Sequence, residues 1–244
     1  MKFGTKIIHS GLQPDQKPTG AVITPIYQTS TYIQKSPGKN LGYEYSRSSN
    51  PTRKALEQNV SSLENGKYGY CFASGMAAID CILRLLKPGD EIICSNDIYG
   101  GTFRLFNQIY TRQNFKFIFS DLQSTKELKN LCTKKTKMIW IETPSNPMMN
   151  IIDIKKITDF SQKHKILTVV DNTFASPYLQ TPLDLGADIV THSATKYLGG
   201  HSDLVLGAAI TNKKYLSDKL YLIQKSCGGI PGPMDCFLTL RGIK

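Results

Sequence analysis

The most constraining feature of the sequence is a regular alternation, after residue 50, of short apolar runs with amphipathic stretches. Residues 91–95 (EIICS), 137–142 (KMIWIE) and 166–171 (ILTVVD) are largely apolar. Strands of this kind are buried on both faces, as in parallel sheets that are covered by helices. The stretches between them carry apolar residues at helical spacing, as Leu56, Val60 and Leu63 do. We therefore predict an α/β fold, with a mostly parallel sheet and helices on both faces.

Capping signals give approximate starting points for the helices. Asn50 is a suitable N-cap and Pro51 suits a first helical position. Ser124 and Glu127 have the spacing of a capping box, and Asp153 can cap a further helix. Helices are thus predicted to begin near residues 51, 75, 100, 124 and 154. Strands are predicted over residues 91–95, 115–119, 137–142, 166–171, 188–192 and 204–210.

The first 50 residues have no clear period. Segments such as TPIYQTSTY (24–32) and GYEYSRSSNP (42–51) are polar and aromatic and contain glycine or proline. We expect residues 1–50 to form an extended arm and residues 51–244 to form one large domain.

A formal net charge of +11 raises the question of a nucleic-acid partner. The charge comes from 24 lysines and only 6 arginines, and the lysines are spread along predicted helices. Arginine is the side chain that base-reading proteins use most. We therefore expect solvated lysine faces and no nucleic-acid partner.

Membrane and metal association are also not expected. The longest strongly apolar run, 204–210, is far shorter than the roughly 20 residues that cross a bilayer. Residues 1–18 lack the continuous apolar segment of a secretory signal, so we expect a cytoplasmic protein. The six cysteines and four histidines lack the spacing of zinc sites or of a disulfide framework.

The segment HSATKYLGGHSD (192–203) contains the strongest chemical signal. Lys196 directly follows a predicted buried strand and lies among the small hydroxyl residues Ser193 and Thr195. A lone lysine is usually a surface residue. At the end of a strand, beside donors that could hold an anionic cofactor, it is a candidate for covalent attachment of a carbonyl cofactor.

Two further segments match the same chemistry. Asp171 ends an apolar strand, where its carboxylate could pair with a protonated pyridine nitrogen, although a turn-capping aspartate is the alternative. Gly75 and Met76 open a helix, where free N–H groups and close backbone approach suit a phosphate. No P-loop motif and no convincing dinucleotide-binding glycine motif is present, so nucleotide phosphates are not favoured.

Phosphate site, aspartate and lysine in this order describe a site for pyridoxal 5′-phosphate (PLP). The chain resembles the trans-sulfuration (Cys/Met metabolism) family of PLP enzymes, which share the aspartate-aminotransferase-like fold (fold type I). The motifs that carry the resemblance extend from about residue 20 to the last residue: GYEYSRSSNPTR, FASGMAAI, DIYGGTFR, WIETPSNP, VVDNTFASPYLQ, HSATKYLGGHSD and GGIPGPMDCFLTLRGIK.

The resemblance implies a role for each candidate residue. Lys196 would bind the cofactor covalently and shuttle protons, and Asp171 would pair with the pyridine nitrogen. The phosphate would be held by Gly75, Met76, Ser193 and Thr195.

The remaining roles also come from the resemblance. Tyr99 would stack on the cofactor ring and assist proton transfer, and Asn146 would lie near the ring hydroxyl. Tyr45 and Arg47 would reach the phosphate of a neighbouring subunit, which implies a homo-oligomer, a dimer of dimers. Without the resemblance, Tyr45 and Tyr99 would be interpreted as core or interface aromatics, and Asn146 as a turn residue.

Within the family, Gly101 stands where similar methionine γ-lyases usually carry cysteine, so cystathionine γ-lyase and cystathionine γ-synthase are the nearest types. The resemblance implies γ-elimination or γ-replacement on L-cystathionine or an O-activated homoserine, both small amino-acid substrates.

Relatives continue past residue 244 with a small C-terminal domain that binds the substrate carboxylate. The alternative function is therefore a truncated, non-catalytic remnant that binds PLP.

Overall fold

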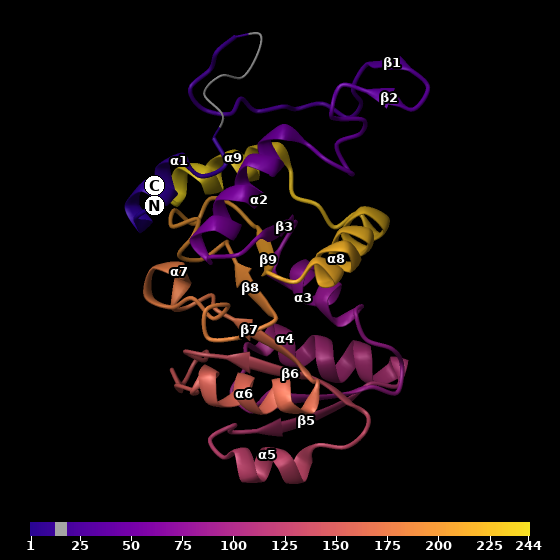
Figure 1. Ribbon diagram of the computed structural model, residues 1–244, viewed down its shortest axis with the longest axis vertical. Coiled ribbons are helices and arrows are strands. Elements are labelled where there is room, and N and C mark those ends of the chain that lie inside the picture. The colour runs from indigo at the N-terminus through magenta and orange to yellow at the C-terminus, as the bar shows by residue number, and fades with distance from the viewer. Residues whose placement is uncertain (13–18) are drawn as a thin grey trace.

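A seven-stranded sheet runs through the structure, which is a computed structural model that describes residues 1–12 and 19–244 (Figure 1). The strands are β3 Tyr68–Phe72, β4 Glu91–Ser95, β5 Lys116–Ser120, β6 Thr136–Glu142, β7 Leu167–Asp171, β8 Ile189–Ser193 and β9 Gly207–Thr211. Their order across the sheet is β3-β9-β8-β7-β6-β4-β5. Strands β8, β7, β6, β4 and β5 are parallel, and β9 is antiparallel to both of its neighbours. The predicted mostly parallel α/β fold is confirmed.

The helices connect these strands. They are α1 Phe3–His9, α2 Pro51–Leu63, α3 Gly75–Leu83, α4 Gly100–Arg104, α5 Thr125–Leu131, α6 Ile154–His164, α7 Ser176–Leu179, α8 Lys214–Cys227 and α9 Pro233–Gly242. The helix predicted near residue 100 is confirmed, but after α4 it continues as a π-helical turn, Leu105–Tyr110, and a 3₁₀ turn, Thr111–Gln113. Within the described part of the chain, no helix is both long and apolar enough to cross a membrane.

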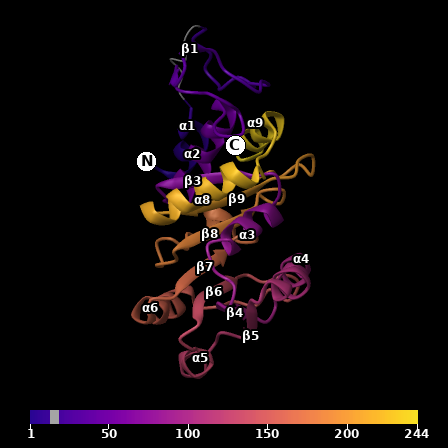
Figure 2. The same cartoon turned by 90° about the vertical axis from the view of Figure 1, so that its right-hand side faces the viewer.

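Alternate residues of the central strands face different helical layers. Trp140 and Val169 pack with α3 and the π-helical turn on one face, whereas Ile141 and Val170 pack with α6 on the other. In Figure 2, α4 and α6 accordingly flank the strands on opposite sides. Helices α2 and α9 cover the second face over β9, where Leu56 joins the core. Because both faces are covered, the strands are apolar almost throughout, which is the pattern that the sequence carries.

Two strand predictions needed correction. Strand β3 was not predicted, because its first three residues, 68–70, are half-buried tyrosines and a glycine, and only Cys71 and Phe72 are buried. The strand predicted from residue 204 begins only at Gly207. Leu204 and Leu206 are buried in the core under α2, and Leu206 bonds the Thr195 side chain instead of a neighbouring strand.

The predicted caps are present. Asn50 Oδ1 accepts from the N–H of Thr52 at 2.9 Å, and Asp153 Oδ1 accepts from the N–H of Lys156 at 3.0 Å. Ser124 Oγ accepts from the Glu127 N–H at 3.3 Å. The Glu127 carboxylate, however, accepts from Ser120 Oγ and does not return to Ser124, so only half of the capping box forms.

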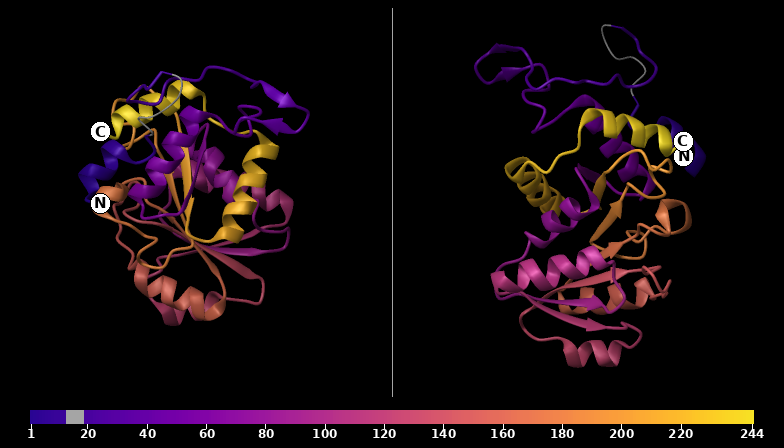
Figure 3. Two further views of the ribbon diagram at one scale, coloured as in Figure 1. Left: turned by 45° about the horizontal axis from the view of Figure 1, so that its top comes forward. Right: turned by 180° about the vertical axis from the view of Figure 1, so that it is seen from behind.

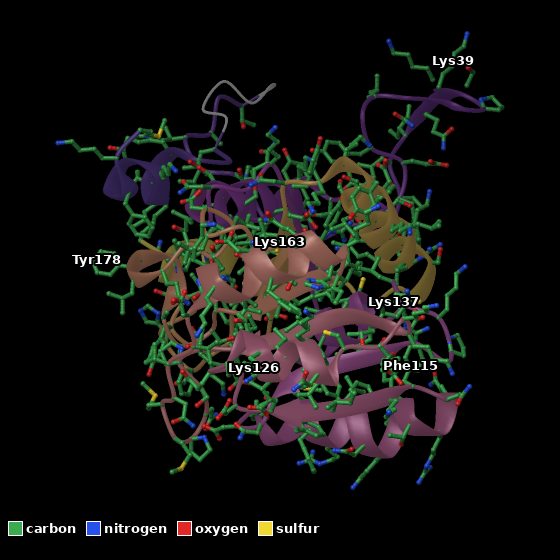
Figure 4. All side chains as sticks on the ribbon, turned by 60° about the horizontal axis from the view of Figure 1, so that its bottom comes forward. Lys39, Phe115, Lys126, Lys137, Lys163 and Tyr178 are labelled. Carbon is green, nitrogen blue, oxygen red and sulfur yellow. The ribbon has the colours of Figure 1, made fainter. Side chains whose placement is uncertain are left out.

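Residues 19–49 run outside the body of the molecule and include the hairpin of β1 Gln34–Ser36 and β2 Lys39–Asn40 (Figures 1 and 3). Lys39 projects from this hairpin, and the labelled lysines Lys126, Lys137 and Lys163 lie on other elements (Figure 4). Helix α1 was not anticipated in the first 50 residues. Residues 13–18 of the expected arm lie outside the described residues.

Replacing Asn50 tests how strongly the start of α2 is held. Asn50→Ala removes the cap and also the bond from Asn50 Nδ2 to the Tyr27 carbonyl at 2.8 Å. We expect the free energy of unfolding in urea to fall by about 2 kcal/mol, about half from each loss. Ser124→Ala, which removes a cap alone, should cost about 1 kcal/mol. Equal losses in the two variants would show that Asn50 acts only as a cap.

Candidate active site

A cavity of ≈ 270 Å³ lies where the carboxyl ends of β6, β7 and β8 meet the start of α3. Ligands of open α/β sheets bind at this edge. Eight of the residues selected from the sequence line it: Gly75, Met76, Tyr99, Asn146, Asp171, Ser193, Thr195 and Lys196. The fold therefore brings together residues that are separated by up to 121 positions in the sequence.

The start of α3 presents backbone donors to this cavity. Ser74 caps the helix, because its Oγ accepts from the Ala77 N–H at 3.1 Å. The N–H groups of Gly75 and Met76 have no acceptor among the described residues. A Cβ built at Gly75 would lie only 2.9 Å from the Ser193 Cβ, so glycine is required for this close packing. Free N–H groups at a helix start suit an anion such as a phosphate.

The turn after β8 presents hydroxyl groups and an amine. The Lys196 N–H donates to the Ser193 carbonyl at 3.1 Å, and the Lys196 carbonyl accepts from the Gly200 N–H at 2.8 Å. Thr195 Oγ1 accepts from the Leu206 N–H at 3.0 Å. Ser193 Oγ and Lys196 Nζ make no hydrogen bond with any residue in the described ranges, so both can bind a ligand.

Asp171 ends β7 and is 8% exposed. Its Oδ1 accepts from the Thr173 N–H at 3.1 Å and from the Thr173 hydroxyl at 2.5 Å. Thr173 Oγ1 also accepts from the Ser193 N–H at 2.9 Å, which joins the ends of β7 and β8. Burial raises the pKa of Asp171, while the Thr173 bonds and nearby His192 lower it. A positively charged ring nitrogen beside Asp171 would favour its ionised form.

Tyr99 precedes α4, and its ring packs against Gly101. A Cβ at Gly101 would lie 2.3 Å from Tyr99 Cε1 and 3.1 Å from Met76 Sδ. The Tyr99 side chain is 46% exposed and lines the cavity. Its ring is therefore available to stack on a planar ligand, in a position that the absence of a side chain at Gly101 permits.

Glu142 lines the cavity but was not selected from the sequence. It ends β6, is buried, and lies beside Asp171 in the parallel register. Its Oε2 accepts from the Tyr99 N–H at 2.8 Å, and its Oε1 accepts from the Asn146 N–H at 3.0 Å. One signal could have identified it, because Glu142 ends an apolar strand just as Asp171 does.

Glu64 and His192 form a buried pair near the same strand ends. His192 Nε2 lies 2.5 Å from Glu64 Oε1, and Asn172 Nδ2 donates to the same oxygen at 2.8 Å. Asn172 also bonds Gln180, which follows α7. This network connects the C-terminal end of α2 to the residue after Asp171 and so stabilises the strand end that carries Asp171.

Tyr45 and Arg47 lie outside this cavity. Arg47 Nη1 donates to the Lys225 carbonyl in α8, and Arg47 Cζ lies 5.3 Å from the centre of the Tyr45 ring. Both side chains are exposed. Their expected contact with a neighbouring subunit stays a prediction.

Together these groups could hold a phosphate, a nitrogen-containing ring and a carbonyl carbon. The free N–H groups of α3 fit the phosphate, and Lys196 Nζ fits the carbonyl. Asp171 Oδ2, which has no hydrogen bond with any described residue, fits the ring nitrogen. These donors and acceptors match the chemical groups of PLP.

The chain is similar to curated proteins along nearly its whole length. It is 52% identical to the cystathionine gamma-lyase of Dictyostelium discoideum over 100% of this chain and 63% of that protein. It is 51% identical to the cystathionine beta-lyase of Coxiella burnetii over 98% of this chain and 62% of that protein. It is 49% identical to the probable cystathionine gamma-synthase of Herpetosiphon aurantiacus over 99% and 76% of the two chains.

A solved structure gives the same result. The cystathionine gamma-lyase from Lactobacillus plantarum, complexed with L-serine, superposes with a TM-score of 0.96 at 45% identity and covers 100% of this chain and 63% of that chain. The chain thus spans less than two thirds of several of these relatives. Residues 4–244 also match the family described as "Cys/Met metabolism PLP-dependent enzyme". The chain therefore belongs to this family, whose cofactor is pyridoxal phosphate.

Proposed function

We propose that this chain provides the cofactor-binding and proton-transferring groups of a cystathionine γ-lyase or γ-synthase. The reaction would be γ-elimination or γ-replacement on L-cystathionine or an O-activated homoserine. The observation that carries this proposal is the cavity at the ends of β6, β7 and β8, where Lys196, Asp171 and the free N–H groups of α3 meet. The similarity to gamma-lyases and gamma-synthases supports it.

Each group has a proposed task. Bound PLP supplies an electron sink for the negative charge that develops at the substrate's Cα. Gly75, Met76, Ser193 and Thr195 bind the phosphate, and Asp171 holds the ring nitrogen protonated. Asn146 would lie near the ring hydroxyl.

Lys196 and Tyr99 perform the proton transfers in this proposal. Lys196 Nζ would hold the cofactor carbonyl covalently and would become a free amine once the substrate amine takes its place. As a free amine it would accept the proton from Cα, give this proton up, and then accept one from Cβ, which would allow the γ-substituent to leave with its bonding electrons. Tyr99 stacks on the ring and assists these transfers.

The oligomeric part of the proposal concerns Tyr45 and Arg47. Both are exposed, lie outside their own cavity, and belong to the segment that runs outside the body. We propose that they complete the phosphate site of a neighbouring copy in a dimer of dimers.

Covalent attachment of PLP tests the assignment of Lys196. The chain mixed with PLP should become yellow, because Lys196 Nζ forms no competing bond with any described residue. Borohydride reduction and peptide mapping should then place the stable cofactor label on Lys196. Lys196→Ala should not be labelled at this site. A wild-type label on another lysine would refute the assignment.

Product analysis tests the reaction itself. From L-cystathionine, γ-elimination yields cysteine, 2-oxobutyrate and ammonia, whereas β-elimination yields homocysteine, pyruvate and ammonia. We expect 2-oxobutyrate from the PLP-loaded chain and none from its Lys196→Ala variant. Pyruvate as the main product would favour the beta-lyase activity of the Coxiella burnetii relative. If neither keto acid forms, the chain has no lyase activity, and γ-replacement on an O-activated homoserine and PLP binding are the parts of the proposal that remain.

Two adjacent glycines test the placement of Tyr99. Gly101→Ala adds a Cβ that would overlap the Tyr99 ring, whereas a Cβ at Gly100 meets nothing within 4 Å. We expect Gly101→Ala to weaken PLP binding by about tenfold, which corresponds to about 1.4 kcal/mol of lost ring contact. Gly100→Ala is the matched control and should keep the wild-type dissociation constant in an absorbance titration. Equal affinities for the two variants would show that the ring position does not matter.

A further inference from the structure

Two buried carboxylates lie side by side in the candidate active site. Glu142 and Asp171 are register partners on the parallel strands β6 and β7, and only 5% and 8% of their surfaces are exposed. Both belong to the sheet face that carries Trp140 and Val169, because residues two apart in a strand share a face. Neither forms an ion pair with a lysine or arginine within residues 1–12 and 19–244.

Glu142 also joins two loops that border the cavity. One oxygen accepts the N–H of Tyr99, in the loop that follows β4, and the other accepts the N–H of Asn146, in the loop that follows β6. The Glu142 N–H donates to Ser95 Oγ at 3.1 Å, so its backbone is fixed from the neighbouring strand β4. A single side chain thus sets the separation of the two loops.

The charges around Glu142 are mostly negative. The titratable groups that border it or share a cavity with it are Asp97 and Tyr99 after β4, Asp121 after β5, Asp171 in β7, His192 in β8 and Lys196 after β8. Burial and then the charge of Asp171 raise the pKa of Glu142 to about 8, with a further increase from Asp97, although the two backbone bonds lower it. Two adjacent buried carboxylates cannot both ionise without a large cost in free energy.

We propose that Glu142 is a positioning residue for Tyr99 and Asn146. We also propose that, while no cofactor is bound, Glu142 is protonated and Asp171 is ionised, so that the pair carries a single negative charge. Both carboxylates accept two hydrogen bonds. The proton stays on Glu142 because His192 in addition lowers the pKa of Asp171, whereas Asp97 raises the pKa of Glu142. The positioning part rests on the proposed function, since it concerns groups that would face PLP. The proton-sharing part concerns the cofactor-free chain alone.

The pH dependence of unfolding of the cofactor-free chain tests proton sharing. The pKa of Glu142 is higher in the native state than in the unfolded state. Such a group contributes its full stabilisation at pH values below its unfolded pKa, and this stabilisation is lost as the pH rises through about 8. Glu142→Gln cannot titrate. The ratio of the wild-type to the Glu142→Gln folding constant should therefore fall about tenfold per pH unit between pH values of about 5 and 8. A ratio that is independent of pH would overturn proton sharing.

Glu91→Gln is the matched control. Glu91 is also buried and lies at the opposite end of the sheet, in β4, where bonds from Thr133 and Lys116 hold its pKa below the usual range. Its titration falls outside the tested pH range, so this variant should keep the wild-type pH dependence.

A second variant keeps the test decisive if Glu142→Gln does not fold. Asp171→Asn removes the neighbouring negative charge and leaves Glu142 free to ionise at lower pH. The loss of stability with rising pH should then move to lower pH than in the wild-type chain. A transition at the wild-type pH would show that the two carboxylates are independent and would overturn the proposal.

Cofactor affinity tests the positioning part. Glutamine keeps one acceptor oxygen and turns its NH₂ toward the other backbone N–H, so one loop loses its anchor. We expect the PLP dissociation constant to rise about tenfold or more in Glu142→Gln, with an altered visible absorption band, and to stay unchanged in Glu91→Gln. Wild-type affinity in Glu142→Gln would overturn the positioning role. If the wild-type chain itself binds no PLP, the proposed function fails, whereas the unfolding experiment still decides proton sharing.

Discussion

The shared register of three parallel strands is the constraint on which the candidate site depends. Asp171 is the register partner of Glu142 on one side and of Thr191 on the other. All three strands end at one edge of the sheet, so the polar residues at their ends converge although their sequence positions are far apart. A shift of one residue between β6 and β7 would turn one carboxylate to the opposite face. The apolar residues that precede them, buried on both faces, hold this register in place.

Burial sets the electrostatics of this edge. Asp171 and Glu142 are buried, and the groups that donate hydrogen bonds to them are a hydroxyl and backbone N–H groups rather than cations. Such surroundings leave the carboxylates with unbalanced negative charge. A cofactor with a positively charged ring nitrogen would balance this charge. Because the site is buried, charges in it are weakly screened, which would strengthen every electrostatic interaction with the bound cofactor.

Membership of the PLP-dependent family and the activity of this chain are separate matters. The similarity covers residues 4–244 and includes gamma-lyases, beta-lyases and gamma-synthases. The cavity contains the groups that would hold PLP, which all three activities would need. What distinguishes them must act on the substrate. One feature of the cavity in this chain depends on a single glycine: the Tyr99 ring can pack against residue 101 only because Gly101 has no Cβ.

The sequence by itself determined the α/β class, several helix starts and six residues of the cavity, because strand burial, caps and strand ends leave local patterns. Two further cavity residues, Tyr99 and Asn146, were found only through the family resemblance. Asn50 and Asp153 are caps as predicted. Only the tertiary structure revealed β3, whose half-buried residues have no such pattern, and the role of Glu142, whose partners are 43 and 29 positions away. It also placed Tyr45 and Arg47 outside the cavity of their own chain. Local sequence records how each element is buried, whereas contacts between distant side chains arise only when the sheet register and the loops are in place.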